Sequence, residues 1–188
     1  MLDKDQLLEG WLKREGEVFT DRGDDRGGPT KFGLTLKLLR SFRHDPDIHP
    51  SVLQDMGWPE AREIIWKVFA EDTYFTLVED PLLFEMLWDA AGNHGPTQAV
   101  KLLQRALMIQ DDGVFGPVTK EAIRWLHPLQ ASLLFQVQRE RLYALIASRN
   151  KEDNDHDGIP DALENLPGWI NRSAGLTEKI AWSIKAPA

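Results

Sequence analysis

The stretch that decides the fold spans residues 15–35 and reads EGEVFTDRGDDRGGPTKFGLT. A first helix precedes it, because apolar residues recur at helical spacing at Leu7, Leu8, Trp11 and Leu12. We expect this helix to end near Glu15-Gly16. Four glycines or prolines and five charges then fall between Asp21 and Pro29. No regular helix tolerates that composition, so the stretch predicts a loop or short hairpin directly after the first helix.

Helical periodicity continues through most of the remaining chain, and few segments alternate as strands do. Prolines that suit a first helical turn predict helix starts at Pro59, Pro81 and Pro128. The helix from Pro128 is expected to be the longest and central, with its apolar stripe at Leu133, Leu134, Val137, Leu142, Leu145 and Ile146. Three tryptophans on apolar helix faces are expected in the core, namely Trp66, Trp88 and Trp125. The pattern therefore predicts a mainly α-helical fold.

Composition narrows the possible functions. The 188 residues, 42% hydrophobic and 28% charged, suit one compact globular unit. A net charge of −8 is the wrong sign for a protein that neutralises phosphates, so nucleic acid is not expected as a partner. The absence of cysteine excludes disulfides, thiolate metal sites and cysteine nucleophiles, and leaves a hard metal ion as the one expected stabilising group.

The sequence contains no targeting or membrane signal that we recognise. Its first residues, MLDKD, lack the basic and then apolar run of a signal peptide, and no stretch approaches about 18 consecutive apolar residues. We therefore expect a protein made in the cytoplasm, without stable membrane insertion, and a monomer.

Glu15 is the first candidate catalytic residue. A glycoside hydrolase needs a carboxylic acid that stays protonated near neutral pH, and a helix end packed on apolar side chains can supply it by desolvation. Eight residues separate Glu15 from Asp24, and five separate Asp24 from Thr30. This spacing resembles the Glu, Asp and Thr triad of phage lysozymes of the T-even type. The alternative is a surface glutamate at a helix end followed by a solvated turn.

A longer string supports the catalytic reading. Residues 25–35, DRGGPTKFGLT, follow Glu15-Gly16 and resemble the N-terminal signature of glycoside hydrolase family 108, the N-acetylmuramidases of phages and secretion systems. The similarity continues through residues 93–96, 103–107, 112–119 and 168–172, which look like the peptidoglycan-binding half of that family. It implies a lysozyme-like fold with a catalytic muramidase region at 1–95 and a peptidoglycan-binding-like helical region at 96–188, both within one compact unit.

The resemblance also implies residue roles. Glu15 would be the general acid that protonates the glycosidic oxygen between N-acetylmuramic acid and N-acetylglucosamine. Asp24, favoured by the triad spacing, or Asp25, favoured by the family string, would position water or stabilise the cation. Thr30 would hold the water, and Gly28 would let the loop backbone approach the saccharide.

Two further residues are candidates for binding substrate. Asn93, within the Asn93-His94-Gly95-Pro96 segment, either lines the cleft or caps a helix. Trp169 either stacks on a sugar or joins the core. The turn at Asp112-Gly113, by contrast, is explained by its glycines alone and is expected to be structural.

Residues 153–164, DNDHDGIPDALE, match the twelve-residue EF-hand calcium loop. The expected calcium ligands are Asp153, Asp155, Asp157, the Ile159 carbonyl, Asp161 directly or through water, and bidentate Glu164. The helix from Pro128 and a short second helix after Pro160 would flank the loop. The alternative is a solvated acidic loop.

The sequence thus predicts a peptidoglycan hydrolase, stabilised or regulated by calcium and used as a phage endolysin that reaches the cell wall after release through a holin. Two alternatives stay open. One is a non-catalytic peptidoglycan-binding module, and the other is a calcium-switched interaction protein.

Overall fold

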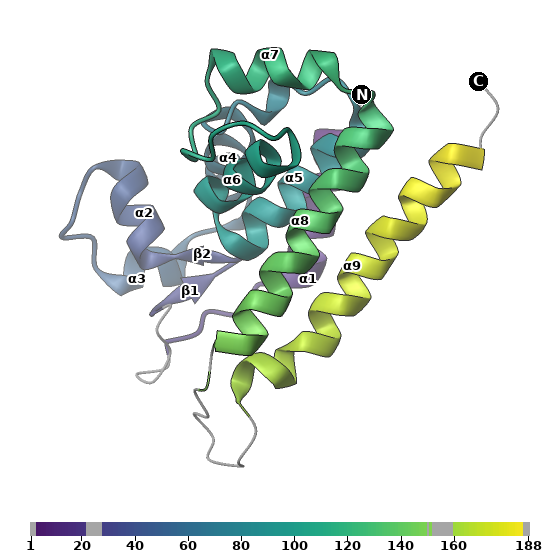
Figure 1. The fold of residues 1–188 in the computed structure, drawn as a ribbon. Helices are drawn as coiled ribbons and strands as arrows, with labels where there is room; N and C mark the ends of the chain where they lie inside the picture. Colours follow the sequence, from purple (N-terminus) through teal and green to yellow (C-terminus); the bar gives the residue numbers. More distant parts are fainter. Residues whose placement is uncertain (1–2, 22–27, 150, 152–159, 186–188) are drawn as a thin grey trace. The chain divides into compact units, whose positions relative to one another are not determined.

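The computed structural model describes residues 3–21, 28–149, 151 and 160–185 (Figure 1). The chain divides into two compact units, residues 1–76 and 77–188. Helices dominate both units, and within the described ranges the sheet content is one antiparallel pair of short strands. The expected mainly α-helical, lysozyme-like fold with a small hairpin after the first helix is therefore confirmed.

The first unit contains four short helices and the hairpin. In chain order these are α1 (Lys4–Glu15), β1 (Thr30–Lys31), β2 (Leu34–Thr35), α2 (Leu36–Arg43), α3 (Pro50–Asp55) and α4 (Trp58–Trp66), followed by the π-helical turn η1 (Lys67–Glu71) and the 3₁₀ turn η2 (Phe75–Leu77) at the boundary between the units. Strand pairing joins Thr30 to Thr35 and Lys31 to Leu34. Side chains from α1, the hairpin, α2 and α4 form the core, including the fully buried Leu8, Leu34, Leu39 and Ile65.

Local signals in the sequence set the ends of these helices. The Asp3 carboxylate accepts a hydrogen bond from the Asp5 amide and caps α1, and the Thr35 hydroxyl does the same for α2 through Leu38. Gly16 ends α1 with a φ of 73°, and its amide donates to the Leu12 carbonyl at 2.8 Å. The first helix ends where the sequence predicts.

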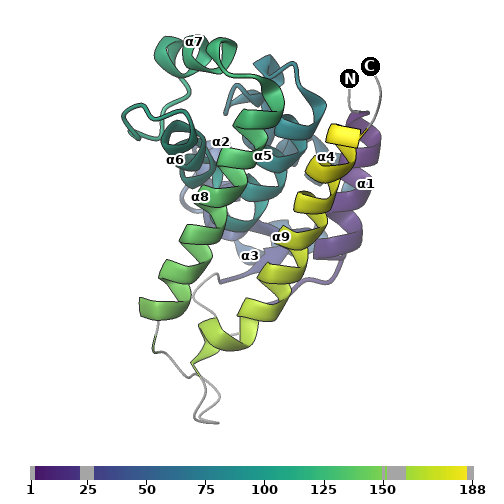
Figure 2. The same ribbon diagram turned by 45° about the vertical axis from the view of Figure 1, so that its right-hand side comes forward.

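In the described residues of the second unit, five helices form a bundle. They are α5 (Pro81–His94), α6 (Pro96–Ala106), α7 (Pro117–Trp125), α8 (Pro128–Arg149) and α9 (Asp161–Lys185). The predicted helix starts at Pro59, Pro81 and Pro128 are confirmed. Helix α5 supplies much of the core and packs on α6 and α8, whereas α9 runs alongside α8 (Figure 2).

The buried face of α8 differs from the expected one. Three residues of the predicted apolar stripe are exposed, namely Leu133, Val137 and Leu145. The buried face is partly polar and carries Ser132, Gln136, Arg139 and Tyr143. The reason lies in the partners, because α5 and α9 present polar groups to this face, and buried polar groups are stable when they are paired.

Two other expectations about the helices are wrong. Helix α9 has 25 residues and α8 has 22, so the helix from Pro128 is not the longest, and no short helix follows Pro160. Pro167 lies inside α9, where it removes one backbone hydrogen bond near the N-terminal end, and packing along α8 maintains the helix.

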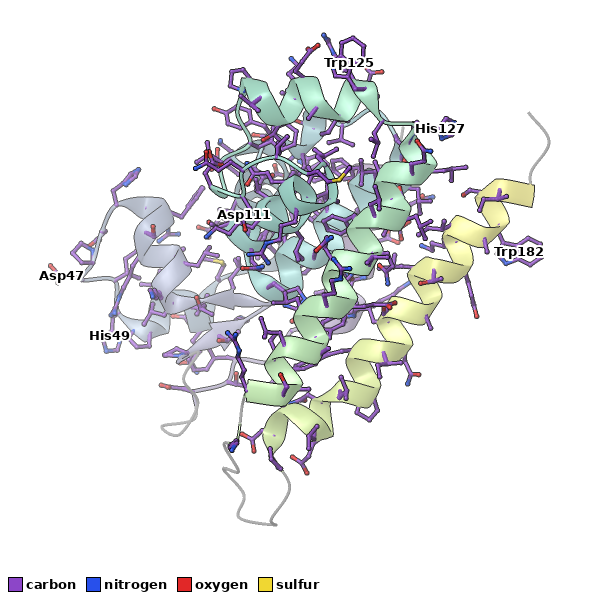
Figure 3. All side chains as sticks on the ribbon, viewed as in Figure 1. Asp47, His49, Asp111, Trp125, His127 and Trp182 are labelled. Atoms are coloured by element: carbon purple, nitrogen blue, oxygen red, sulfur yellow. The ribbon has the colours of Figure 1, made fainter. Side chains whose placement is uncertain are left out.

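Trp125 is not a core residue, whereas Trp88 is buried as expected. The Trp125 ring is 80% exposed and projects outward from α7 (Figure 3), with its indole N–H donating to Glu121 at 3.1 Å. Among the helices that the structure describes, none has both the length and the hydropathy of a membrane span.

Candidate active site

Glu15 is the last residue of α1, and its side chain is exposed where Gly16 turns the chain away from the helix. One helical turn earlier, Trp11 is buried in the core of the first unit. From the sequence we expect an acid that packs on apolar side chains. In the structure, one side of the Glu15 side chain contacts Gly33 and the other is open to solvent.

Gly33, in the turn of the hairpin, supplies the packed side. Phe32 and Gly33 have φ values of 56° and 77°, as a two-residue hairpin turn with both residues in the left-handed region requires. A Cβ atom on Gly33 would lie 2.9 Å from Cγ of Glu15 and 3.1 Å from Nε1 of Trp11. Because Gly33 has no side chain, the hairpin turn can contact the Glu15 side chain. Any other residue at position 33 would displace the Glu15 side chain.

The hairpin turn is fixed to its surroundings by the residues around Gly33. The Trp11 indole N–H donates a buried hydrogen bond of 2.8 Å to the Phe32 carbonyl. The Phe32 ring packs against Trp58 with ring centroids 5.6 Å apart, and the Lys31 ammonium donates to the Met56 carbonyl at 2.9 Å. These contacts hold the turn rigidly beside the end of α1, which is what a positioned catalytic carboxyl needs.

Thr30 closes the base of the acidic loop. It exchanges two backbone hydrogen bonds with Thr20, of 2.9 and 2.8 Å, and its hydroxyl donates to the Gly28 carbonyl at 3.0 Å. The structure thus brings the predicted residues Thr30 and Gly28 together next to the hairpin. Asp24 and Asp25 lie outside the described residues, within a segment whose two ends meet at this bridge.

Asn93 and Trp169 belong to a second cluster, within the second unit. The Asn93 side chain donates to the Asp89 carbonyl at 2.7 Å and accepts a hydrogen bond from the Arg172 guanidinium. Trp169 stacks on Tyr143 with ring centroids 5.4 Å apart and planes at 14°. Asn93 therefore joins α5 to α9, and Trp169 joins α9 to α8, so both residues already have protein partners.

A buried ion pair lies beneath this cluster. Arg139 is fully buried, pairs with the Asp89 carboxylate and donates from Nε to the Tyr143 hydroxyl at 2.9 Å. The His94 ring lies 5.2 Å from the Tyr143 ring. Burial, together with the nearby Arg139 charge, lowers the pKa of His94 to about 4, and burial raises the pKa of Tyr143.

The turn at Asp112-Gly113 is structural, as expected. The Gln104 amide is buried and donates to Asp112 at 2.7 Å, to the Val114 carbonyl at 3.0 Å and to Thr119 at 3.1 Å. The Gly113 amide returns a bond of 2.8 Å to the Gln104 oxygen. Bonds from the Val114 amide and from Gln104 lower the pKa of the Asp112 carboxyl. Gln104 therefore fixes the loop that leads into α7.

Four predicted calcium ligands lie outside the described residues: Asp153, Asp155, Asp157 and Ile159. Asp161 and Glu164 occupy the first turn of α9, and α8 ends at Arg149. The order of helix, loop and helix fits an EF-hand, and the two described carboxylates stand three positions apart at the start of the second helix. Calcium binding stays a prediction.

Sequence reasoning missed two groups of residues. Gly33 and Trp11 position Glu15, and Arg139 with Asp89 forms the buried pair. The glycine in the Phe32-Gly33 dipeptide signalled a turn, but no local signal indicated its contact with α1. No feature of the sequence indicated that Arg139, within the helical pattern of α8, would be buried.

Two parts of the chain match known family models. Residues 8–95 match the family model Glycosyl hydrolase 108, and residues 98–174 match the model Predicted Peptidoglycan domain. Glu15, Thr30 and Gly33 lie in the first match, and Trp169 lies in the second. The resemblance to family 108 is thus supported by a family-model match over residues 8–95.

A structure titled "Structure of Brucella abortus SagA" is similar in fold, with a TM-score of 0.75 and 20% identity over 95% of this chain and 93% of that chain. No curated protein matched the chain. At this identity the solved structure shows the fold, whereas the family matches bear on activity. The chain is thus similar to the glycosyl hydrolase 108 model over its first part and to a peptidoglycan domain model over its second part, and together these matches support a peptidoglycan hydrolase.

Proposed function

We propose that the protein is a muramidase that cleaves the β-1,4 bond from N-acetylmuramic acid to N-acetylglucosamine in peptidoglycan, with Glu15 as the general acid. The observation that carries the proposal is the placement of Glu15. Its carboxyl group is exposed at the end of α1, and the glycine of the hairpin turn packs against it within a region that matches Glycosyl hydrolase 108.

This placement suits proton donation to a bound sugar. A saccharide that covers the open side of Glu15 would exclude water from the carboxyl group, which favours its neutral, proton-donating form. The Trp11 and Gly33 contacts hold the group still, so the proton would meet the glycosidic oxygen in a fixed geometry. Transfer of that proton lets the leaving sugar depart as positive charge develops on the other ring.

The second carboxylate of the reaction is assigned to the acidic loop, as Asp24 or Asp25. It would stabilise the developing cation or orient the attacking water. Thr30 and Thr20 hold the two ends of this loop together beside the hairpin. In this proposal the Thr30 hydroxyl, which donates to Gly28, retains lone pairs that can accept a hydrogen bond from the water.

The direct test compares two glutamates that lie two positions apart. Glu15→Gln keeps the shape of the side chain but removes the acid, so release of reducing ends from purified peptidoglycan should fall at least ~10²-fold. Glu17→Gln is the matched control, since Glu17 is also exposed, and it should keep near-normal activity. Equal activity of the two variants would remove Glu15 from the mechanism.

The same assay separates the alternative functions. A non-catalytic peptidoglycan-binding module would sediment with peptidoglycan and release no reducing ends. A protein for which peptidoglycan is no partner would do neither. The proposal requires wild-type protein to release reducing ends, and we assign its biological use to host lysis as a phage endolysin.

We also propose a calcium ion in the 153–164 loop. Its support is the twelve-residue ligand pattern, flanked by α8 before it and by α9, which begins at Asp161. When bound, the ion would neutralise part of the charge of five neighbouring carboxylates. We also keep Asn93, just before the 96–188 region, and Trp169, within it, as proposed contacts to the saccharide.

A further inference from the structure

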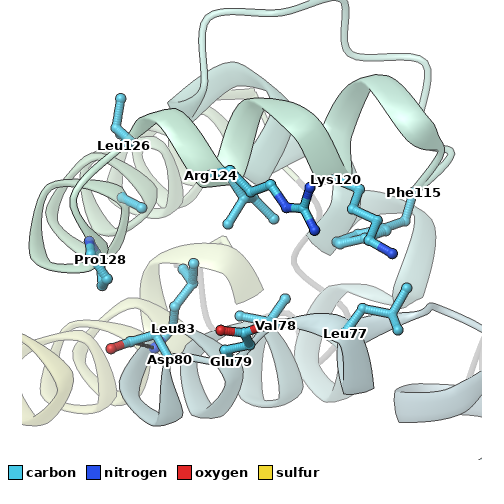
Figure 4. Close-up of a pocket in the computed structure, with 12 residues that line it drawn as sticks. Leu77, Val78, Glu79, Asp80, Leu83, Phe115, Lys120, Arg124, Leu126 and Pro128 are labelled. Carbon is cyan, nitrogen blue, oxygen red and sulfur yellow. Dashed lines mark hydrogen bonds between the residues drawn. The ribbon is translucent and has the colours of Figure 1, made fainter.

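The second unit contains a cavity of about 310 Å³ that the proposed reaction does not use (Figure 4). It lies between α7, the start of α8 and the segment that leads into α5. The buried side chains of Val78, Leu83, Phe115 and Ala131 form an apolar lining. A volume of this size is at the lower end of the range for sites that hold small ligands.

The rim of the cavity carries charges of both signs on opposite walls. Lys120 and Arg124, one helical turn apart on α7, supply two cations, and Glu79 supplies a carboxylate from the segment before α5. Figure 4 shows Lys120 and Arg124 projecting from α7 toward the segment that carries Leu77 and Glu79. Asp80 also lines the cavity, but one of its carboxylate oxygens accepts the Leu83 amide at 2.8 Å as the cap of α5.

The two cations are available to a ligand. Lys120 forms no ion pair with any residue in the described part of the chain, and Arg124 has only a contact of 3.7 Å to Glu121 on its own helix. Both side chains are exposed, so an anion can reach them. An ion pair of that length on an exposed helix face contributes little and is easily exchanged.

The wall that bears these cations is held in place. Gln104 binds Asp112, Val114 and Thr119, and so fixes the loop that carries Phe115 and begins α7. Gly113 allows the loop to approach α6 closely, because a Cβ there would lie 2.7 Å from Thr97. The shape of the cavity is therefore preorganised, which reduces the entropic cost of binding.

We propose that this cavity binds the peptide stem of peptidoglycan, which deepens the proposed function and rests on it for the class of ligand. The N-acetylated sugars of the glycan strand offer no charge to a pair of cations. The stem peptide carries free carboxylates, small methyl side chains and the free amine of its diamino acid. These groups match Lys120 and Arg124, the apolar lining and Glu79 respectively.

The test uses the full chain with the Glu15→Gln substitution, so that binding is measured without cleavage. The probe is the tetrapeptide N-acetyl-L-Ala-D-Glu-meso-diaminopimelate-D-Ala, in which the free amine is that of the diamino acid, titrated by calorimetry and by amide chemical shifts. We expect shifts at the cavity, and Arg124→Glu should weaken binding at least ~10-fold. Arg141→Glu, at an exposed position on α8, is the matched control and should bind normally.

A second probe tests the carboxylate of the cavity rim. Acetylation of the diaminopimelate amine removes the group assigned to Glu79, so the affinity of the modified tetrapeptide should fall, whereas Glu79→Gln protein should bind the two peptides equally. Equal effects of Arg124→Glu and Arg141→Glu, or shifts confined to other surfaces, would overturn the proposal. If wild-type protein cleaves peptidoglycan but the Glu15→Gln protein does not bind the tetrapeptide, this site alone is refuted. If the tetrapeptide binds but wild-type protein does not cleave peptidoglycan, the proposed reaction alone is refuted.

Discussion

The half-buried His94 of the second unit should make this protein lose stability in mild acid. His94 lies against Tyr143 and near Arg139, and its folded-state pKa is about 4, compared with an ordinary value of 6.5. Above pH 6.5 the histidine is neutral in both the folded and the unfolded state, so folding costs no proton there and stability is at its full value. Between pH 6.5 and 4 the unfolded chain binds the proton first, so this contribution is lost as the pH falls.

The size of the effect follows from the two pKa values. At pH 5.0 the unfolded histidine is almost fully protonated, whereas the folded one is largely neutral. The free energy of unfolding should therefore fall by about 2 kcal/mol between pH 7.5 and 5.0 through this residue alone. The opposing influence of Asp89 and the supporting one of Arg172 are already included in the folded pKa.

Urea unfolding at the two pH values, followed by tryptophan fluorescence, measures this difference. Other groups also titrate in this range, so the comparison is made with His94→Gln, and with His127→Gln as the control because His127 is exposed. The pH-dependent loss should be about 2 kcal/mol smaller in His94→Gln than in wild type. The same loss in all three proteins would refute the burial argument.

The remaining predictions concern the first unit and calcium. Gly33→Ala strains a turn at positive φ and places a methyl group against the Glu15 side chain, so kcat for peptidoglycan should fall at least ~10-fold; unchanged kcat would show that this contact does not position the proposed acid. Asp24→Asn and Asp25→Asn should differ, with one nearly inactive and the other not, and equal mild losses would exclude both from the chemistry. Millimolar calcium should raise the melting temperature of wild type but not of Asp153→Ala/Glu164→Ala protein, by linkage of about RT ln(1 + [Ca]/Kd); an unchanged wild-type melting temperature would refute a calcium site.

The sequence was informative wherever a local rule sufficed. Gly16 ended the first helix, a hairpin with its turn at Phe32-Gly33 followed the glycine-rich stretch, and prolines marked the helix starts. These features depend on backbone conformation at one or two residues, which residue type largely determines. For the same reason the turn at Asp112-Gly113 could be assigned a structural role in advance.

Features that depend on distant partners could not be predicted in this way. The periodicity of α8 fits two faces, and the buried one was decided by Asp89 and Ser173 on other helices. Trp125 was placed in the core because it falls on an apolar helix face of the sequence pattern, but its ring is 80% exposed. The contact of Gly33 with Glu15 joins residues whose proximity only the folded first unit reveals.

The central claim is that Glu15 donates the proton that breaks the bond after N-acetylmuramic acid. The most direct measurement is mass analysis of borohydride-reduced products from peptidoglycan digested by wild-type, Glu15→Gln and Glu17→Gln protein. The account predicts reduced N-acetylmuramic acid ends in the wild-type and Glu17→Gln digests, and at least ~10²-fold fewer in the Glu15→Gln digest. Reduced N-acetylglucosamine ends, or undiminished product from Glu15→Gln, would contradict it.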